Sequence, residues 1–533
     1  MLGNDTLTVE NTARFARAPA GTAVGIAEEA ASRMDGSVAV RDELISMRRP
    51  IYGVTTGFGD SAQYHLSPGK TTELQRNLVK YHLNGTGPSA PADVVRATML
   101  IRANCLARGY SGIRRSVVEL LLDCLRHDIT PVIPERGSVG ASGDLVPLCY
   151  LADMLMGSGT VRVGDELLPA TAALRSRGLE PVAFEAKEGL ALINGTSFMS
   201  GFGVVAVHDA DVLCTLADLC TALAAEALLG NRGHFQPVIH RQKPHPGQVR
   251  SAQRVRALVS GSALCVDTPQ VLEANPDIDD SGVLALGRPI QDRYSVRCAP
   301  HVNGVLADTV DWVTRWLDVE INSSNDNPLF DATTGEVYNG GNFYGGHVGH
   351  AMDSLKLAVA SVGDILDRQL AMMVDTKFNH GLTLNLVRRV APRDPAAGLH
   401  HGFKGMQIAS SALAAEALKL TNPATAFSRS TEAHNQDKVS MGTIAARDAR
   451  TVVELVAEIA AIHLLAGCQA ADLRGPHLLG RGTRAGYELI RAHVPVVDQD
   501  RRLDGDLRTV VELIRSGALL SAIGPHLGTG EAA

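Results

Sequence analysis

Two apolar stripes with the period of an α-helix constrain the fold of this chain more than any other feature. The first stripe recurs at intervals of four, three, four and four residues: Leu355, Val359, Val362, Leu366 and Leu370. The second stripe has the same character: Val452, Leu455, Val456, Ile459 and Ile462. Such spacing places each set on one face of a helix. Both are interpreted as buried faces of long helices rather than as functional motifs.

The composition agrees with a helical core. Aromatic residues make up 4% of the 533 residues and hydrophobic residues 45%, so the core must consist mainly of Ala, Leu and Val. Ala and Leu favour close-packed helices. The length allows about two to four domains or one large core.

The two halves of the chain differ in texture. Residues 1 to about 200 are punctuated by Gly and Pro, whereas long helical periodicities follow, with Pro328 and Pro423 at expected breaks between helices. The sequence therefore predicts an N-terminal domain over residues 1–200 and a helical bundle over residues 201–533.

Charge and cysteine usage exclude several classes of protein. Fifty basic and 57 acidic residues give a net charge of −7, which argues against a role at nucleic acid or at a membrane surface. The eight cysteines form no Cys-x-x-Cys pair, as expected for reduced thiols in the cytoplasm. Glu10 and Arg14 occupy the place of an apolar signal segment, and no apolar run approaches the length of a membrane span. Without a His-Glu-x-x-His motif or a phosphate-binding glycine loop, neither a metal nor a nucleotide is expected.

The tripeptide Ala141-Ser142-Gly143 lies in a run of glycines and other small residues, from Gly137 to Asp144. Glycines permit backbone conformations that a Cβ atom would forbid. A turn that is tight enough brings the Gly143 nitrogen to the Ala141 carbonyl carbon. Attack there and loss of two waters would give a five-membered ring in which the Ser142 side chain becomes an exocyclic methylene. That group is an electrophile that can capture amines.

Two other interpretations of the tripeptide need to be weighed. Most small-residue clusters are ordinary turns, so the tripeptide alone is weak evidence. A serine-hydrolase elbow requires Gly-x-Ser-x-Gly, and Asp144 stands where the second glycine would be. The ring-forming interpretation depends on the motifs elsewhere in the chain.

Those motifs resemble, in order and over nearly the whole chain, the histidine and aromatic amino acid ammonia-lyase and aminomutase family. The matching segments are residues 51–59, 74–79, 137–145, 191–197, 294–300, 324–328, 341–343 and 435–441. The resemblance implies a mainly α fold like that of fumarase and aspartase, with a long central helical bundle. It also implies that the N-terminal domain carries the ring, 4-methylideneimidazole-5-one (MIO), formed autocatalytically from Ala141, Ser142 and Gly143. A homotetramer with shared active sites, acting on a small amino acid, is implied as well.

The same resemblance assigns roles to single residues. Tyr52 is expected to be the catalytic base, in a Gly- and Thr-rich segment interpreted as a mobile lid. A phenol is normally protonated at neutral pH, so nearby positive potential is expected to lower its pKa. Asn194 and Tyr294 are expected to steady the ring oxygen and relay protons. Arg297, between apolar neighbours, is expected to be buried and to clamp the substrate carboxylate through two parallel hydrogen bonds.

The remaining expected contacts concern the substrate. Asn327 is expected to donate a further hydrogen bond to the carboxylate, and Phe343 to wall the ring. Tyr81 and His82 stand at the family's selectivity position, where a histidine can hydrogen-bond a phenol or an imidazole. Gln436, where histidine lyases carry a glutamate, favours tyrosine or a related hydroxylated ring.

Four residues depart from the family's pattern, and they leave the exact substrate open. Tyr344 and Gly346 replace the family's usual His and Gln. Lys404 interrupts residues 402–407, where the family is apolar, and Lys438 follows Asp437. Solvated lysines are the simplest explanation; a more polar pocket is the alternative.

The sequence thus predicts an ammonia-lyase for tyrosine or a related polar aromatic amino acid. A tyrosine-type 2,3-aminomutase, which returns the ammonia to the β-carbon, is the near alternative. A lyase-like scaffold without catalysis is the remote one.

Overall fold

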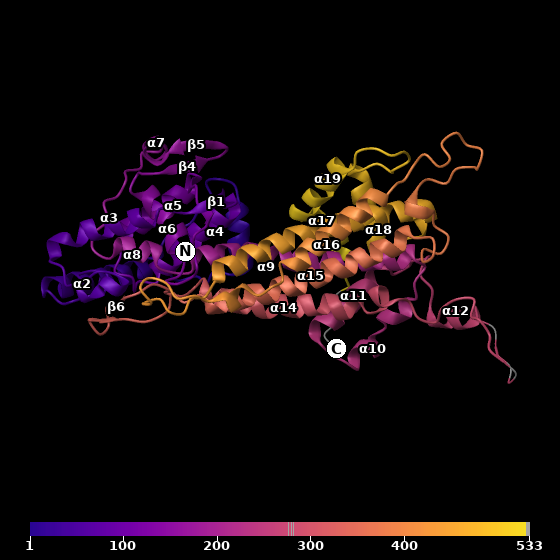
Figure 1. Ribbon diagram of the computed structural model, residues 1–533, viewed down its shortest axis with the longest axis horizontal. Coiled ribbons are helices and arrows are strands. Elements are labelled where there is room, and N and C mark those ends of the chain that lie inside the picture. Colours follow the sequence, from indigo (N-terminus) through magenta and orange to yellow (C-terminus); the bar gives the residue numbers. More distant parts are fainter. Residues whose placement is uncertain (276, 279, 281, 529–533) are drawn as a thin grey trace. The chain divides into compact units, whose positions relative to one another are not determined.

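The computed structural model describes residues 1–275, 277–278, 280 and 282–528, and it is mainly helical (Figure 1). Two compact units divide the chain. The first unit comprises Met1–His208, Val313–Ser354 and Asn422–Arg450, and the second comprises Asp209–Trp312, Leu355–Thr421 and the residues from Thr451 onward. Two late segments therefore join the first unit, which a division of the sequence at residue 200 does not anticipate. The domain boundary itself stays a prediction.

The first unit is built around helix α4 (Ala92–Ala107), which is buried over most of its length. It also contains α1 (Val9–Arg17), α2 (Glu28–Ser46), α3 (Thr71–His82), α5 (Arg115–Arg126), α6 (Leu145–Leu155), α7 (Ala170–Arg175) and α8 (Glu188–Ile193), with 3-10 turns η1 (Gly59–Gln63), η2 (Pro68–Lys70) and η5 (Ala424–Phe427). Helix α4 packs against α1 and α5. Every α4 residue from Val94 to Ala107 is buried, so its polar side chains, including Arg102, must be satisfied inside the protein.

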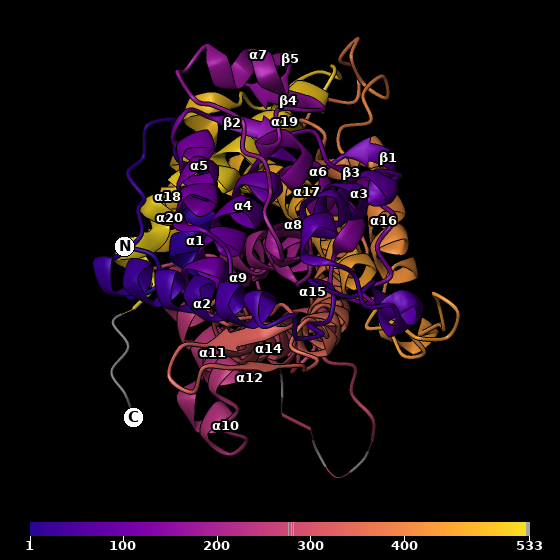
Figure 2. The same cartoon turned by 90° about the vertical axis from the view of Figure 1, so that its left-hand side faces the viewer.

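Three small antiparallel sheets complete the first unit. Strand β1 (Thr86–Ser89) pairs with β3 (Pro134–Arg136), β2 (Ile129–Pro131) with β4 (Thr160–Val163) and β5 (Glu166–Pro169), and β6 (Leu329–Asp331) with β7 (Glu336–Tyr338). In Figures 1 and 2, α7 lies beside the β4–β5 hairpin, which it contacts.

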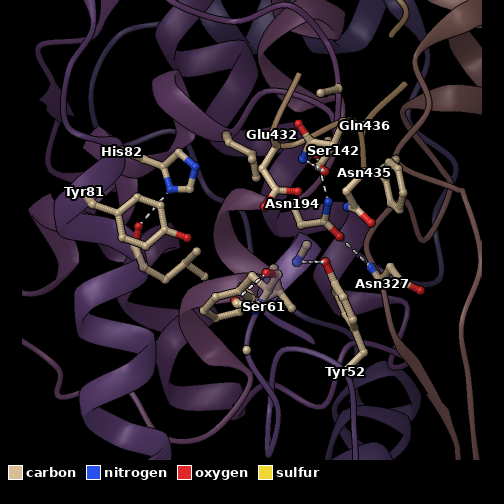
Figure 3. Close-up of a pocket in the computed structure, with 18 of the residues that line it drawn as sticks. Tyr52, Ser61, Tyr81, His82, Ser142, Asn194, Asn327, Glu432, Asn435 and Gln436 are labelled. Atoms are coloured by element: carbon tan, nitrogen blue, oxygen red, sulfur yellow. Dashed lines mark hydrogen bonds between the residues drawn. The ribbon is translucent and has the colours of Figure 1, made fainter. Parts of the chain in front are cut away.

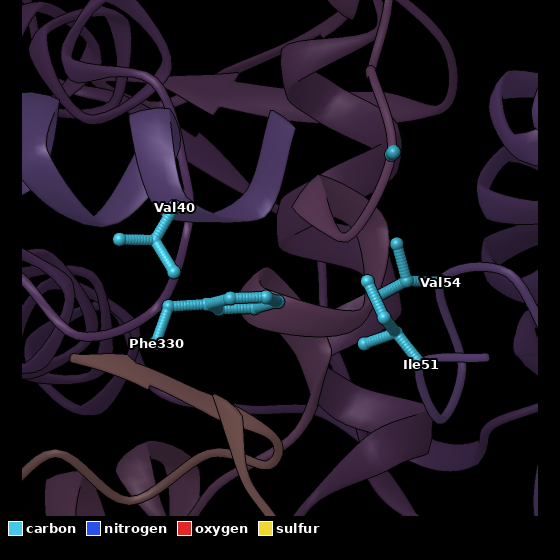
Figure 4. Close-up of a cluster of buried hydrophobic side chains, with 5 residues drawn as sticks. Val40, Ile51, Val54 and Phe330 are labelled. Atoms are coloured by element: carbon cyan, nitrogen blue, oxygen red, sulfur yellow. The ribbon is translucent and has the colours of Figure 1, made fainter. Parts of the chain in front are cut away.

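A small apolar cluster fixes the segment that precedes the site. Ile51 and Val54 belong to the same buried cluster as Val40 from α2 and Phe330 from β6 (Figure 4). Burial of this apolar surface favours the packed position of residues 51–54.

Four long helices contribute residues to both units: α9 (Ser197–Ala227), α14 (Ala299–Glu320), α15 (Gly346–Val374) and α17 (Gly442–Arg474). The first apolar stripe lies on α15, where all five of its members are buried, and the second lies on α17. Both predicted helices are confirmed. Pro328 directly precedes β6, and Pro423 lies between α16 (Lys404–Lys419) and η5, so both predicted breaks are confirmed too.

The second unit adds further helices around its share of the long ones. They are η3 (Arg232–Phe235), α10 (Pro237–Arg241), α11 (Pro246–Leu258), α12 (Thr268–Glu273), α13 (Tyr294–Arg297), η4 (Leu384–Leu386), α16, η6 (Pro476–Leu478), α18 (Arg481–His493), α19 (Asp504–Arg515), α20 (Ala518–Ile523) and η7 (Gly524–His526).

Within the described residues, α17 alone is long and apolar enough to cross a membrane by length and composition, although no such segment was expected. Of its most apolar 18-residue window, 78% is buried inside the protein, as in a core helix. All eight cysteines are free, and only Cys298 is not fully buried. The described part of the chain contains no cluster of three His, Cys, Asp or Glu side chains arranged to hold a metal ion.

Candidate active site

A cavity of about 620 Å³ lies within the first unit. It is lined by Tyr52, Gly57, Phe58, Gly59, Ser61, Leu74, Asn77, Leu78, Tyr81, His82, Ala141, Ser142, Leu145, Leu190, Asn194, Asn327, Phe343, Tyr344, Glu432, Asn435, Gln436, Asp437 and Lys438. Nine residues predicted from the sequence meet here, although their segments lie far apart in the chain (Figure 3): Tyr52, Tyr81, His82, Ala141, Ser142, Asn194, Asn327, Phe343 and Gln436.

The predicted ring-forming tripeptide lies in a tight turn that begins at Gly140 and ends at Gly143. Gly140 and Gly143 have φ angles of +67° and +73°, in the left-handed region that L side chains rarely adopt. A Cβ atom at Gly143 would lie 2.1 Å from the carbonyl oxygen of Gly195. The backbone is therefore folded tightly at the tripeptide, and the residues present fit the ring that the resemblance implies.

Two donors hold the carbonyl oxygen of Ser142, which would become the oxygen of that ring. Asn194 Nδ2 donates to it at 2.8 Å and the Gly195 amide at 3.3 Å. The Asn194 side chain is itself fixed, because its Oδ1 accepts from the Asn327 amide at 2.7 Å. Figure 3 shows Asn194 between Ser142 and Asn327. This arrangement places preorganised donors where negative charge can develop.

Asp144 anchors the end of the tripeptide in the core. Its carboxylate accepts from the Met199 amide, in the first turn of α9, at 2.7 Å and from the Ser138 hydroxyl at 3.0 Å. Burial is the main influence on this carboxyl group and raises its pKa to about 6, against these hydrogen bonds and one from Thr443. The anchor explains why residue 144 is an acid rather than the glycine of a hydrolase elbow.

The Tyr52 segment, interpreted from the sequence as a mobile lid, is packed over residues 51–56. Its mobility stays a prediction. Thr55 and Thr56 are buried, and their hydroxyls accept from the amides of Ile51 and Gly53 at 2.8 and 3.1 Å. These threonines therefore satisfy the turn's own backbone. The less buried stretch begins at Phe58, and Gly57, Phe58, Gly59 and Ser61 line the cavity.

The electrostatic expectation for Tyr52 is reversed in this chain. Its phenol oxygen accepts from the Gly59 amide at 3.0 Å. Burial nevertheless raises the pKa of Tyr52, the Gly59 donor lowers it, and the charge of Glu432 raises it further. Among the described residues, the groups that shift this pKa are Gly59 and Glu432, and neither is a cation.

Glu432 is the main residue of the cavity that the sequence did not reveal. Its carboxylate accepts from the Asp60 amide at 3.0 and 3.3 Å. Glu432, Ala433 and His434 have φ angles of +50°, +51° and +66°, an unusual left-handed turn without glycine. No periodicity marks such a turn; the only available signal was its place directly before the matched segment 435–441.

Gln436 contacts the tripeptide itself. Its Nε2 donates to the Ser142 hydroxyl at 3.1 Å, while its Oε1 accepts from the Thr431 hydroxyl at 3.0 Å. The two hydroxyls hold the Gln436 amide from opposite ends. Gln436 thus both lines the cavity and contacts the tripeptide.

His82 presents a hydrogen-bond acceptor at the cavity. Its Nδ1 lies 2.9 Å from the Leu78 carbonyl oxygen, which can only accept, so Nδ1 carries the proton. Burial lowers the pKa of His82, and the ring is therefore neutral near pH 7 with an unprotonated Nε2. The neighbouring Tyr81 ring lies 4.3 Å away, centroid to centroid.

Tyr294 and Arg297 do not line this cavity; both lie on α13 in the second unit. Tyr294 is 72% exposed. Arg297 is half-buried rather than buried, with its guanidinium 4.5 Å from the Tyr294 ring centroid and its Nε donating to the Asp292 carbonyl at 3.0 Å. Burial of Arg297 was expected because its neighbours Val296 and Cys298 are apolar. Val296 is buried, but Cys298 is only partly buried.

The four departures from the family's pattern fall in different places. Tyr344 and Lys438 line the cavity, whereas Lys404 is an exposed residue at the start of α16 in the second unit. Gly346 and Tyr344 are linked, because a Cβ atom at position 346 would lie 2.7 Å from the Tyr344 ring. The tyrosine ring therefore occupies the space that a larger residue at 346 would need.

This chain is similar in sequence and in structure to known proteins of one family. Residues 7–492 match the family model of aromatic amino acid lyases. A histidine ammonia-lyase of Gloeobacter violaceus is 43% identical over 89% of this chain and 88% of its own. The crystal structure of tyrosine aminomutase from Streptomyces globisporus has a TM-score of 0.90 and 36% identity over 98% of both chains. That of histidine ammonia-lyase from Trypanosoma cruzi has a TM-score of 0.87 and 34% identity, covering 99% of this chain and 95% of that one.

Proposed function

This chain belongs to the aromatic amino acid lyase family and is a carbon–nitrogen lyase or aminomutase, and from that premise we propose that it eliminates ammonia from L-histidine. The product is an α,β-unsaturated acid. The substrate differs from the tyrosine that the sequence motifs favoured, for the reasons given below.

The observation that carries the proposal is the pair of donors on the Ser142 carbonyl oxygen, from Asn194 and the Gly195 amide. They support assignment of Ala141, Ser142 and Gly143 as the source of MIO, which supplies an electrophile that makes a substrate amine easier to expel. The chain's own residues then have to bind the substrate, exclude water and move its β-proton.

Tyr52 is the base in this proposal. It lines the same cavity as Ser142, and the Gly59 amide fixes its phenol oxygen. Because burial and the charge of Glu432 raise its pKa, positive charge from another subunit is proposed to assist the loss of the Tyr52 proton. Arg297 and Tyr294 of another subunit are proposed to supply that half of the site. This requires the homotetramer with shared active sites that the sequence implied, in the cytoplasm.

Two polar groups in the cavity favour an imidazole. The unprotonated Nε2 of His82 can accept from a ring N–H, and the Glu432 carboxylate adds an anionic acceptor. Gln436 had argued against histidine because it is neutral, but Glu432 supplies a carboxylate from the same loop. Relatives described as histidine ammonia-lyases that are 35–43% identical over most of the chain support this choice.

Tyrosine is the second candidate, with either elimination or 2,3-aminomutase chemistry. His82 Nε2 can equally accept from a phenol, and the Streptomyces globisporus tyrosine aminomutase is a structural neighbour over the whole chain. A lyase and an aminomutase share the base, and they differ in how long the closed site retains the product and ammonia.

The test is incubation of the purified protein with L-histidine, L-tyrosine and L-phenylalanine, following ammonia and organic products by chromatography. Ammonia with an unsaturated acid from L-histidine, and at most a minor rate from the other two, is the expected result. A preference for L-tyrosine would refute the substrate assignment, and a β-amino acid would identify an aminomutase. No product from any of them, with the tripeptide cyclised, would refute both candidate substrates.

A further inference from the structure

Arg102, on α4, is a fully buried cation directly behind the tripeptide. Its Nη1 donates to the backbone carbonyl of Asn194 at 2.9 Å. Among the described residues, its Nε and Nη2 have no hydrogen-bond partner, and its side chain is 0% exposed. A buried guanidinium that makes one hydrogen bond is costly, so its retention needs a reason.

The Asn194–Gly195 peptide group connects this cation to Ser142. Its carbonyl oxygen accepts from Arg102, and its amide, from Gly195, donates to the Ser142 carbonyl oxygen at 3.3 Å. Hydrogen bonds in such a chain polarise one another. A cation on the carbonyl therefore makes the amide a stronger donor toward Ser142.

Gly195 permits this close approach. Its φ angle is +147°, and a Cβ atom there would lie 2.2 Å from Arg102 Nη1. Any larger residue would push the guanidinium away from the peptide group.

Among the described residues, no carboxylate accepts a hydrogen bond from Arg102. The buried carboxylate of Asp326 is engaged elsewhere, by Lys187 Nζ at 2.7 Å and by the Ser111 hydroxyl at 2.9 Å. Lys187 and Asp326 are fully buried and neutralise each other. The positive charge of Arg102 therefore polarises the Asn194–Gly195 peptide group in a buried setting, where solvent screens it little.

We infer that Arg102 is a positioning residue that stabilises negative charge on the Ser142 carbonyl oxygen while the tripeptide cyclises. The inference rests on the proposed function, because it presumes that the ring forms. Closure joins the Gly143 nitrogen to the Ala141 carbonyl carbon, and the Ala141 oxygen leaves as water with the amide protons of Ser142 and Gly143. The Ser142 hydroxyl then leaves as a second water with the Ser142 α-proton. Removal of the Gly143 amide proton and of the Ser142 α-proton each places negative charge on the Ser142 oxygen.

The test follows water loss in newly made protein. Wild type, Arg102→Met, Arg102→Gln and Arg102→Lys are synthesised in a cell-free system, sampled over time, and digested with trypsin. The peptide spanning residues 137–162 carries the tripeptide, and its mass reports the loss of one or two waters without any assay of activity. Arg96→Met is the matched control: Arg96 lies on the same helix and is 5% exposed, but it pairs with Asp128 at 2.6 Å.

Arg102→Met and Arg102→Gln are expected to lose the two waters about tenfold more slowly than Arg96→Met, or slower still. Arg102→Lys, which keeps the charge, recovers a rate closer to wild type than the glutamine variant. If the methionine variant does not fold, the glutamine and lysine variants decide the matter. The inference is overturned if Arg102→Met or Arg102→Gln cyclises as fast as Arg96→Met. It is also overturned if Arg102→Lys cyclises no faster than Arg102→Gln. A wild-type peptide that keeps both waters instead refutes the ring of the proposed function.

Discussion

The phenol oxygen of Tyr52 accepts one hydrogen bond from its own chain, from the Gly59 amide, and lies in a setting that raises its pKa. Under the proposed function, a base in this position receives compensating positive charge from a second subunit. The sequence could point to Tyr52 through its motif. It could not show that the surrounding threonines serve the backbone, because that use of a hydroxyl depends on the turn they form.

Tyr52→Phe removes the proposed base while keeping the ring. We expect kcat to fall by about 10² to 10⁴-fold with little change in KM. Tyr64→Phe is the control, since Tyr64 is 64% exposed and does not line the cavity. Steady-state kinetics on L-histidine would contradict the assignment if both variants kept wild-type kcat.

The lowered pKa of His82 predicts that KM rises at acid pH. Burial lowers its pKa, so the ring stays neutral until the pH falls below the ordinary histidine value of 6.5. Protonation then turns Nε2 into a donor, which repels a substrate N–H or O–H. KM is therefore expected to rise as the pH falls, with a midpoint below 6.5.

The control for this limb is the exposed His127, away from the cavity. KM measured against pH should keep the limb in His127→Gln and lose it in His82→Gln, whose baseline KM rises about 10-fold. An unchanged limb in His82→Gln would show that another group titrates.

At the scale of elements, the two long helices followed from their apolar period, because periodicity reports burial directly. The loops of the site did not. Residues 431–436 form a left-handed turn, with Thr431 and Gln436 paired through their backbones. Through Glu432 this turn holds the Asp60 amide at the start of η1, while Gln436 holds Ser142. One loop thus contacts both the cavity rim and the tripeptide.

Glu432→Gln tests this connection. The variant loses the charged acceptor of the Asp60 amide, and hydrogen exchange over residues 57–63 should become faster. Glu432 also raises the pKa of Tyr52, so its removal should move the Tyr52 limb of the kcat profile to lower pH. Asp437→Asn, another acidic residue of the cavity, is expected to change neither measurement. Unchanged exchange in Glu432→Gln would show that its carboxylate does not hold the rim.

At the scale of the whole molecule, the chain's own cavity contains nine predicted site residues but neither Tyr294 nor Arg297. A sequence motif carries no information about which copy of a chain completes a site. The family resemblance supplied that expectation, and it stays a prediction.

Complementation tests the shared site. Tyr52→Phe and Arg297→Met are each expected to be inactive alone. Coexpressed with different tags and purified through both, they should recover up to about a quarter of wild-type activity, because some sites combine an intact residue from each chain. A mixture with no activity beyond that of the single variants would argue that both residues act within one chain.

The proposed origin of the electrophile in Ala141, Ser142 and Gly143 is tested by comparing ammonia release from L-histidine by the wild-type protein and by Ser142→Ala, prepared identically. We expect release by the wild type alone. Its peptide 137–162 should be lighter than its sequence by two waters, while the variant should be folded, uncyclised and inactive. Release of ammonia by Ser142→Ala at the wild-type rate would contradict the claim that Ala141, Ser142 and Gly143 supply the electrophile.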